Sequence, residues 1–353
     1  MERLSRLLDS IEPADPQWED KAWQRLRSQI RPRGSLGQLE FIGARLASIQ
    51  RTLTPALQKK LIFTMAGDHG VAAEGVSAFP QEVTGQMVYS FTRGWASINV
   101  LARHVGADVR VVDCGIACDI PPDWPVVHRK IGKGTRSIAA GPAMTRAEGV
   151  EGLLLGAELV ENAFEQEGYE LFGTGDMGIA NTTPSTAIVA AFSGKPVAEL
   201  TGRGTGIDDK SFAHKISVIE RALAVNRPDP ADALDVLCKV GGYEIAGLAG
   251  AVLGAASVKA PIVCDGFIAT AGALIACRLC PRAADYLFLS HRSHEVGHAV
   301  MADLLGIRPI LDLDMRLGEG TGSALAMNII EASARVLMDI KTFAEAGVSD
   351  TGH

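Results

Sequence analysis

The sequence predicts a three-layer α/β fold, in which a mostly parallel, Rossmann-like sheet is flanked by helices. Short, continuous apolar runs alternate with longer helical patterns through most of the chain. Runs of this kind are typical of parallel strands that are buried on both faces. Glycine-rich and polar clusters follow the apolar runs rather than precede them, so we expect these clusters along one edge of the sheet.

The first half of the chain begins with helical patterns and then changes to alternating strands and helices. Ser35 can cap the second helix, and the apolar run from Lys60 ends at Gly67, as expected for a buried strand. The elements expected here are helices over 1–30, 36–53, 81–104 and 146–167, and strands over 60–66, 108–113 and 170–172.

The second half continues the alternation, and its apolar runs are again followed by glycine or polar residues. The expected helices are one that ends near 192, one that carries Lys215, three over 231–240, 243–257 and 268–279, one that ends at 305 and one over 323–338. The expected strands are 261–265, 286–289 and 309–313. We expect an α/β catalytic core over 56–322. The helices of 1–55 and 323–353 lie outside the alternating pattern and are expected to pack together as a small lobe.

Composition restricts the functional class. With 353 residues, of which 47% are hydrophobic, the chain can bury a large core. Its formal net charge of -7 argues against a nucleic-acid or membrane-surface binder, because no basic excess is available to neutralise phosphates. The N-terminus lacks an apolar signal core, and the longest uncharged apolar run, 245–258, is too short to span a bilayer. We therefore expect a cytoplasmic protein.

One carboxylate lies inside a glycine-rich loop late in the chain. Gly318, Gly320 and Gly322 stand at every second position around Glu319, between an expected strand and an expected helix. Glycine permits φ > 0 and lets the backbone approach a ligand closely. Glu319 is therefore a candidate general base. The alternative is a plain strand-to-helix turn whose glutamate faces water.

Two further glycine-rich loops are candidate phosphate sites. The loop 173–183 ends at an expected helix start, where backbone N–H groups form a natural anion site. It lacks the Gly-Lys-[Ser/Thr] of a Walker A loop and the acidic ribose partner of a dinucleotide site. The loop 202–206 contains Arg203, and Lys215 follows on the next helix, so both can supply positive charge.

The sequence also fits two functions other than that of a nucleotide-dependent enzyme. His294-Glu295-Val-Gly-His298 matches the H-E-x-x-H signature of zinc metallopeptidases, in which Glu295 would be the base that acts on zinc-bound water. Gly297 weakens the helix that this motif needs, which counts against it. The second alternative is a regulatory module that binds a nucleotide through the same glycine loops without turnover.

Taken together, the loops resemble those of the nicotinate-nucleotide–dimethylbenzimidazole phosphoribosyltransferase family. The matching segments occur in the family's order and cover nearly the whole chain. They are 34–40, 66–71, 175–183, 202–209, 241–246, 265–268, 290–293 and 316–322. The resemblance implies transfer of phosphoribose from nicotinate mononucleotide to 5,6-dimethylbenzimidazole or a related lower base, in the nucleotide-loop assembly of cobalamin biosynthesis.

The resemblance also implies roles for individual residues. Glu319 would take the proton of the azole N–H, and Gln86 would line the base pocket. This chain has Asp176 where the family commonly has glutamate, so the contact made by that shorter side chain is open. The resemblance implies no metal or cofactor, and it implies a homodimer. The other residues placed in the substrate site are Gly175, Met177, Gly178, Arg203, Gly204, Lys215, Ser290 and Leu317.

Overall fold

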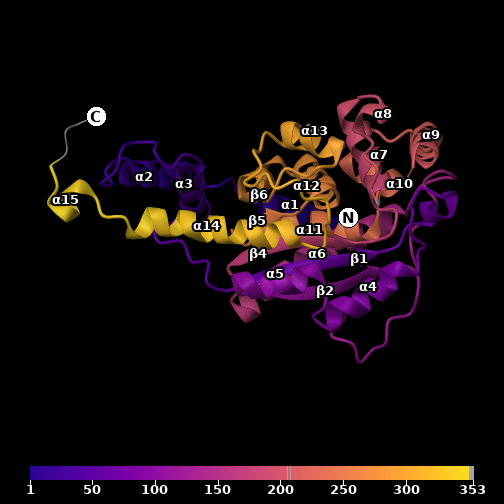
Figure 1. Cartoon of the computed structure of the whole chain (residues 1–353), viewed down its shortest axis with the longest axis horizontal. Coiled ribbons are helices and arrows are strands. Elements are labelled where there is room, and N and C mark those ends of the chain that lie inside the picture. Colours follow the sequence, from indigo (N-terminus) through magenta and orange to yellow (C-terminus); the bar gives the residue numbers. More distant parts are fainter. Residues whose placement is uncertain (205, 207, 350–353) are drawn as a thin grey trace.

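The chain folds around one parallel sheet, which confirms the predicted α/β class (Figure 1). The computed structural model describes residues 1–204, 206 and 208–349. Within these residues the six strands follow the order β3-β2-β1-β4-β5-β6, and each neighbouring pair is parallel. The strands are β1 (Lys60–Gly67), β2 (Ala107–Gly115), β3 (Val126–His128), β4 (Leu171–Met177), β5 (Ile262–Cys264) and β6 (Leu287–Leu289).

Helices connect the strands and extend from both ends of the chain (Figure 1). The helices of the first half are α1 (Glu2–Ser10), α2 (Pro16–Arg27), α3 (Gln38–Gln50), α4 (Val83–Thr92), α5 (Ser97–Val105) and α6 (Arg146–Glu167). The helices of the second half are α7 (Thr182–Ser193), α8 (Val197–Leu200), α9 (Asp209–Asn226), α10 (Ala233–Val240), α11 (Tyr243–Ser257), α12 (Phe267–Leu279), α13 (Val296–Leu305), α14 (Thr321–Asp339) and α15 (Phe343–Ala346).

The two faces of the sheet are covered by different helices. On β1, Met65 packs beside Gly247 of α11, whereas Ile62 packs beside Gly320, next to the start of α14. These two strand residues are an odd number of positions apart, so their side chains point to opposite faces. Helix α11 therefore lies on one face and the start of α14 on the other, which gives the three predicted layers.

Close approach of backbones explains part of the glycine content. Helix α6 packs against α11, and a Cβ at Gly156 would lie 2.0 Å from the carbonyl oxygen of Gly247. A Cβ at Gly250 would lie 2.0 Å from the carbonyl oxygen of Leu153. Because these distances are far below contact distance, the helix pair can form only with glycine at both positions.

Four expected elements differ from the observed ones. The pattern over 1–30 forms two helices, α1 and α2, and that over 81–104 forms α4 and α5, separated by a turn in which Gly94 has a φ of 73°. The segment 173–177, expected as a loop, continues β4, because β1 pairs with it through Met177. The segment 309–313 is not a strand, and Leu311 forms only an isolated bridge with His291.

Segments from both ends of the chain pack together beside the sheet (Figure 1). Helices α2 and α3 contact α14, and Gln29 bridges to Thr342. Helix α1 instead packs against α6 and α11. The domain boundaries remain a prediction, and residues 350–353 of the expected C-terminal segment lie outside the described part of the chain. The residues that α2, α3 and α14 bury between them are Ala22, Leu26, Ala44, Ala47 and Leu337.

Candidate functional site

A cavity of about 630 Å³ lies where the glycine-rich loops meet, beyond the carboxyl end of β4. Its wall combines the end of β4, the starts of α7 and α12, helix α4 and the loop before α14. Most of its lining is apolar, with a few convergent polar groups, as in sites for small organic ligands. The lining includes Val76, Phe79, Val83, Met87, Asp176, Met177, Gly178, Ile179, Asn181, Thr182, Gly204, Phe267, Ile268, His291, Glu295, Arg316, Leu317, Gly318 and Glu319.

The loop that carries Glu319 has an unusual backbone conformation. Gly318, Glu319 and Gly320 have φ angles of 88°, 64° and 100°. A glutamate in this left-handed region is strained by roughly 1–3 kcal/mol, and surrounding structure must hold it there. Gly175 makes room for the loop, because a Cβ at that position would lie 2.3 Å from the carbonyl oxygen of Glu319. The residue with the strained backbone is therefore the one that carries the carboxylate between the glycines.

The Glu319 carboxylate borders the cavity and is only 6% exposed. Its Oε2 accepts a hydrogen bond of 3.2 Å from the backbone N–H of Ile98, at the start of α5. Burial raises the pKa of Glu319, and the backbone N–H groups of Ile98 and Ser97 partly oppose that rise. A carboxylate of raised pKa with access to the cavity can accept a proton from a bound ligand.

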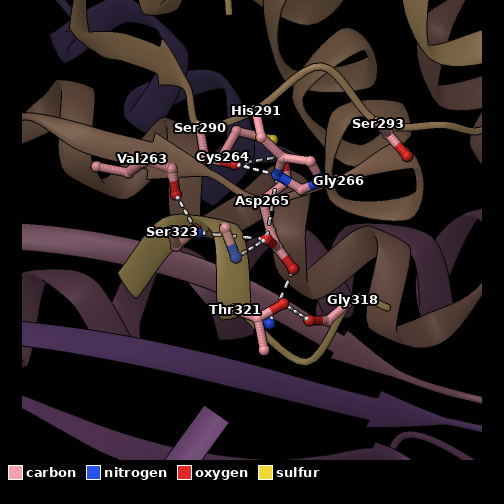
Figure 2. A network of polar contacts seen from close by, with 12 residues as sticks. Val263, Cys264, Asp265, Gly266, Ser290, His291, Ser293, Gly318, Thr321 and Ser323 are labelled. Carbon is pink, nitrogen blue, oxygen red and sulfur yellow. Dashed lines mark hydrogen bonds and ion pairs between the residues drawn. The ribbon is translucent and has the colours of Figure 1, made fainter. Parts of the chain in front are cut away.

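Asp265 binds the backbone of this loop through both of its carboxylate oxygens (Figure 2). Its Oδ2 accepts a hydrogen bond of 2.8 Å from Gly320 N, and its Oδ1 accepts bonds of 2.8 Å from Gly322 N and 3.3 Å from Ser323 N. Burial raises the pKa of Asp265 to about 7 against the opposing effect of these three N–H groups, and nearby Glu319 raises it further. Asp265 is fully buried and does not line the cavity.

Asp176 lies at the end of β4 and lines the cavity. Asn181 Nδ2 donates a hydrogen bond of 3.0 Å to its Oδ2, whereas Oδ1 has no hydrogen-bond partner among the described residues. Burial raises the pKa of Asp176 well above its ordinary value, and the nearby charge of Asp265 adds to this effect. Asp176 is therefore a candidate hydrogen-bonding group for a ligand at the cavity wall.

A buried cation lies directly behind the cavity wall, next to the lining residues Thr182 and Gly204. Lys215 of α9 is 1% exposed, and its Nζ donates a hydrogen bond of 2.7 Å to Oγ1 of Thr182, at the start of α7. Burial lowers the pKa of Lys215 to about 8, while the charge of Glu295 opposes this effect. A Cβ at Gly204 would lie 3.2 Å from Lys215 Nζ, so the second glycine loop passes directly over the ammonium. An ammonium beside a helix start can bind an anionic group.

The structure brings together most of the residues expected in the site. Gly175 lies behind the loop, and Ser290 is fully buried and hydrogen-bonded to the backbone carbonyl of Asp265. Arg203 is exposed and forms an ion pair with Asp209. Thr205 of the 202–206 loop lies outside the described residues. The expected residues that line the cavity are Asp176, Met177, Gly178, Gly204, Leu317 and Glu319.

Gln86 does not line the cavity. Its side chain is exposed on α4, whereas Val83 and Met87 of the same helix contribute to the wall. These two apolar residues are one helical turn apart and therefore share a face. Within this chain, the cavity-facing surface of α4 is formed by Val83 and Met87 rather than by the expected Gln86.

The H-E-x-x-H match is not arranged as a zinc site. Helix α13 begins at Val296, so His294 and Glu295 precede it and the two histidines do not share one helix face. His294 is exposed, whereas His298 is buried and its pKa is lowered by burial to about 4. Among the residues that the structure describes, no group of three or more His, Cys, Asp or Glu side chains has a metal-binding arrangement.

The sequence did not identify three polar residues that line the cavity, Asn181, Thr182 and Glu295, as part of the site. Thr182 and Asn181 stand in the 173–183 loop, but only the fold shows that Thr182 contacts Lys215 and that Asn181 contacts Asp176. Glu295 enters the cavity wall rather than a zinc site, and a Cβ at Gly202 would lie 1.7 Å from its Oε2. Asn181 and Thr182 stand at the start of α7 and Glu295 directly precedes α13, so a polar residue at a helix start was the available signal for these positions.

No helix in the described part of the chain is both long and apolar enough to cross a membrane.

The phosphoribosyltransferase family matches residues 11–348.

Relatives of known name match along the whole chain. The nicotinate-nucleotide–dimethylbenzimidazole phosphoribosyltransferase of Syntrophobacter fumaroxidans is 73% identical, with 100% of both chains covered. The protein of the same name from Geobacter sulfurreducens is 56% identical over 99% of both chains. The crystal structure of CobT from Thermus thermophilus is similar with a TM-score of 0.91 and 44% identity, covering 95% of this chain and 99% of that one.

Proposed function

Because this chain belongs to the nicotinate-nucleotide–dimethylbenzimidazole phosphoribosyltransferase family, we propose that Glu319 is the general base of its reaction. The enzyme moves the 5-phosphoribosyl group from nicotinate mononucleotide to 5,6-dimethylbenzimidazole in cobalamin biosynthesis. The products are nicotinate and α-ribazole 5′-phosphate. The observation that supports the role of Glu319 is its buried carboxylate at the wall of a largely apolar cavity.

The reaction requires one proton acceptor. An azole nitrogen forms a bond to ribose C1′ while the bond from C1′ to the pyridinium nitrogen breaks, and that electron pair neutralises the leaving nicotinate ring. The azole N–H proton passes to Glu319. A pyridinium is already a good leaving group, so the reaction needs orientation and one base rather than a strong acid. Orientation alone can contribute ~7–11 kcal/mol.

The flat base is assigned to the apolar part of the cavity. Leu317 is two residues from Glu319 and is 55% exposed, so its side chain is available for contact. Val83 and Met87 of α4 add apolar surface to the same cavity. Stacking an aromatic ring on such surface buries apolar area from both partners. This arrangement leaves the azole N–H free to face the carboxylate.

The phosphoribosyl group is assigned to the polar part of the cavity. Lys215 supplies an ammonium, Thr182 a hydroxyl, and Gly204 an open backbone over both. The unpartnered Oδ1 of Asp176 is suited to a ribose hydroxyl. Aspartate reaches less far than the glutamate usual in the family, so the sugar must approach β4 more closely here.

The test of the base is Glu319→Gln, which keeps the shape and removes the proton acceptor. We expect kcat to fall by roughly 10²-fold or more with nicotinate mononucleotide affinity retained, because the base acts only in the transition state. The exposed Glu82, which precedes α4, provides the matched control Glu82→Gln with unchanged kcat. A Glu319→Gln variant with wild-type kcat, or a β-anomeric product by NMR, would contradict the assignment.

We also infer a cytoplasmic homodimer, as expected from the family resemblance. Phe41 and Ile30 are 65% and 42% exposed in the N-terminal region, and apolar surface of this kind is often covered by a partner. Light scattering on the purified protein measures the mass directly, and a monomeric mass at micromolar concentration would reject the dimer.

A further inference from the structure

The loop of Glu319 is held by hydrogen bonds with residues of β1 and β4 and with Asp265, which follows β5. Thr64 of β1 donates from its hydroxyl to the carbonyl of Glu319 over 2.9 Å. The N–H of Glu319 donates to the carbonyl of Asp176, at the end of β4, over 3.2 Å. The N–H of Gly320 donates to the Asp265 carboxylate, just after β5, over 2.8 Å. Two of these contacts involve backbone atoms of Glu319, and the third fixes the residue that follows it.

Asp265 differs from the other two contacts because it binds both the loop and the helix after it. One carboxylate oxygen accepts from Gly320, and the other accepts from Gly322 and Ser323 in the first turn of α14 (Figure 2). A single planar group therefore fixes the angle between the loop and the helix. That angle sets the direction in which the Glu319 side chain leaves the backbone.

We propose that Asp265 is a positioning residue for phosphoribosyl transfer, whose two carboxylate oxygens hold Glu319 in its proton-accepting orientation at the cavity. This inference rests on the proposed role of Glu319. Asp265 is fully buried and outside the cavity lining, so it acts through the loop and not by contact with substrate.

The chemistry requires a carboxylate at this position. The three backbone groups that hydrogen-bond to the side chain are all N–H donors, one to Oδ2 and two to Oδ1. An asparagine has one acceptor oxygen, and its NH₂ group would face N–H donors on the other side. Replacement of Asp265 by asparagine would therefore release either Gly320 or the start of α14. In both cases the strained φ of Glu319 loses part of its support.

The surroundings of Asp265 fix its own position. Ser290 Oγ donates to the Asp265 backbone carbonyl over 2.9 Å and lies 2.8 Å from Nδ1 of His291. The same His291 nitrogen would lie 2.0 Å from a Cβ at Gly322, so only glycine lets the helix start reach the carboxylate. Figure 2 shows Ser290 and His291 beside Asp265. Ser290 thus fixes the backbone of Asp265, while the Asp265 carboxylate binds the loop and the start of α14.

A double-mutant cycle separates positioning from general stability. Asp265→Asn is made alone and together with Glu319→Gln, and kcat and nucleotide Kd are measured for each variant. We expect Asp265→Asn alone to lower kcat by roughly 10²-fold, because a small misplacement of a catalytic group costs about that much. Nucleotide Kd should stay close to wild type. In the Glu319→Gln background Asp265→Asn should cause no further loss, since the group it positions is already gone.

Three results would overturn the proposal: wild-type kcat in Asp265→Asn, a fully additive loss in the double variant, or a loss of nucleotide affinity as large as the loss of kcat. If Asp265→Asn does not fold, the same cycle with Ser290→Ala decides, because that change loosens Asp265 without removing its carboxylate. A smaller kcat loss that vanishes with Glu319→Gln supports the proposal, and an additive or absent loss rejects it. Wild-type kcat in Glu319→Gln itself would refute the proposed base instead.

Discussion

Replacing Lys215 by methionine tests how the cavity recognises the phosphate. Methionine keeps much of the apolar stem in the buried site on α9 and removes only the ammonium. Lys215 is 1% exposed and already oriented by its 2.7 Å bond to Thr182, so little side-chain entropy is lost when it binds an anion. The full strength of a charge-assisted hydrogen bond should therefore be available to the substrate.

The expected magnitude follows from that geometry. A hydrogen bond to a charged group contributes about 1.5–3 kcal/mol, and each 1.4 kcal/mol corresponds to a factor of ten. Lys215→Met should thus lower kcat/KM for nicotinate mononucleotide by roughly 10- to 140-fold. Lys210→Met is the matched control, because Lys210 is exposed on the same helix and should leave kcat/KM unchanged.

The assay compares two substrates, nicotinate mononucleotide and its dephosphorylated nucleoside. In the wild type we expect the nucleoside to be much the poorer substrate. In Lys215→Met the advantage of the nucleotide should shrink by the same factor that kcat/KM falls, because the phosphate has lost its partner. Equal losses for nucleotide and nucleoside would refute the reasoning, since they would show that Lys215 supports the fold or the ribose rather than the phosphate.

Two further predictions concern pH and metal. Because burial lowers the pKa of Lys215 to about 8, its charge is present below that pH and lost above it, so KM for the nucleotide should rise above pH 8. Lys215→Arg should abolish this rise, and a rise that persists would point to another group. The purified enzyme should turn over with a chelator present. His294→Ala should keep full activity, because His294 is exposed and precedes α13. Stoichiometric zinc whose removal abolishes turnover would contradict metal independence.

Local patterns in the sequence were sufficient to predict the fold class and to single out Glu319, whose catalytic role stays a prediction. The alternation of short apolar runs with helical patterns depends on neighbouring residues, and helices α6 and α11 were predicted with their observed bounds, 146–167 and 243–257. Glu319 was recognisable because the glycines beside it signal a left-handed backbone, which the structure shows at 318–320. Both inferences rest on conformational preferences that act over a few residues.

Pairing between distant segments decided what the local pattern could not. Gly173 to Met177 looks like a loop because glycine is a poor strand former, yet it forms part of β4 because β1 is available as its partner. The run at 309–313 looks like a strand, yet only Leu311 forms an isolated bridge there. Whether a short segment becomes a strand depends on a neighbour that the segment itself does not encode.

The same limit applies to the site. The sequence by itself determined that an α/β chain of this family carries a carboxylate in a glycine loop, because those signals lie in contiguous residues. Only the tertiary structure decided that Asp265 binds the backbone of Gly322, 57 residues away, and that Lys215 reaches Thr182, 33 residues away. Hydrogen-bond partners are chosen by distance in space, and folding brings together groups whose separation along the chain carries no signal.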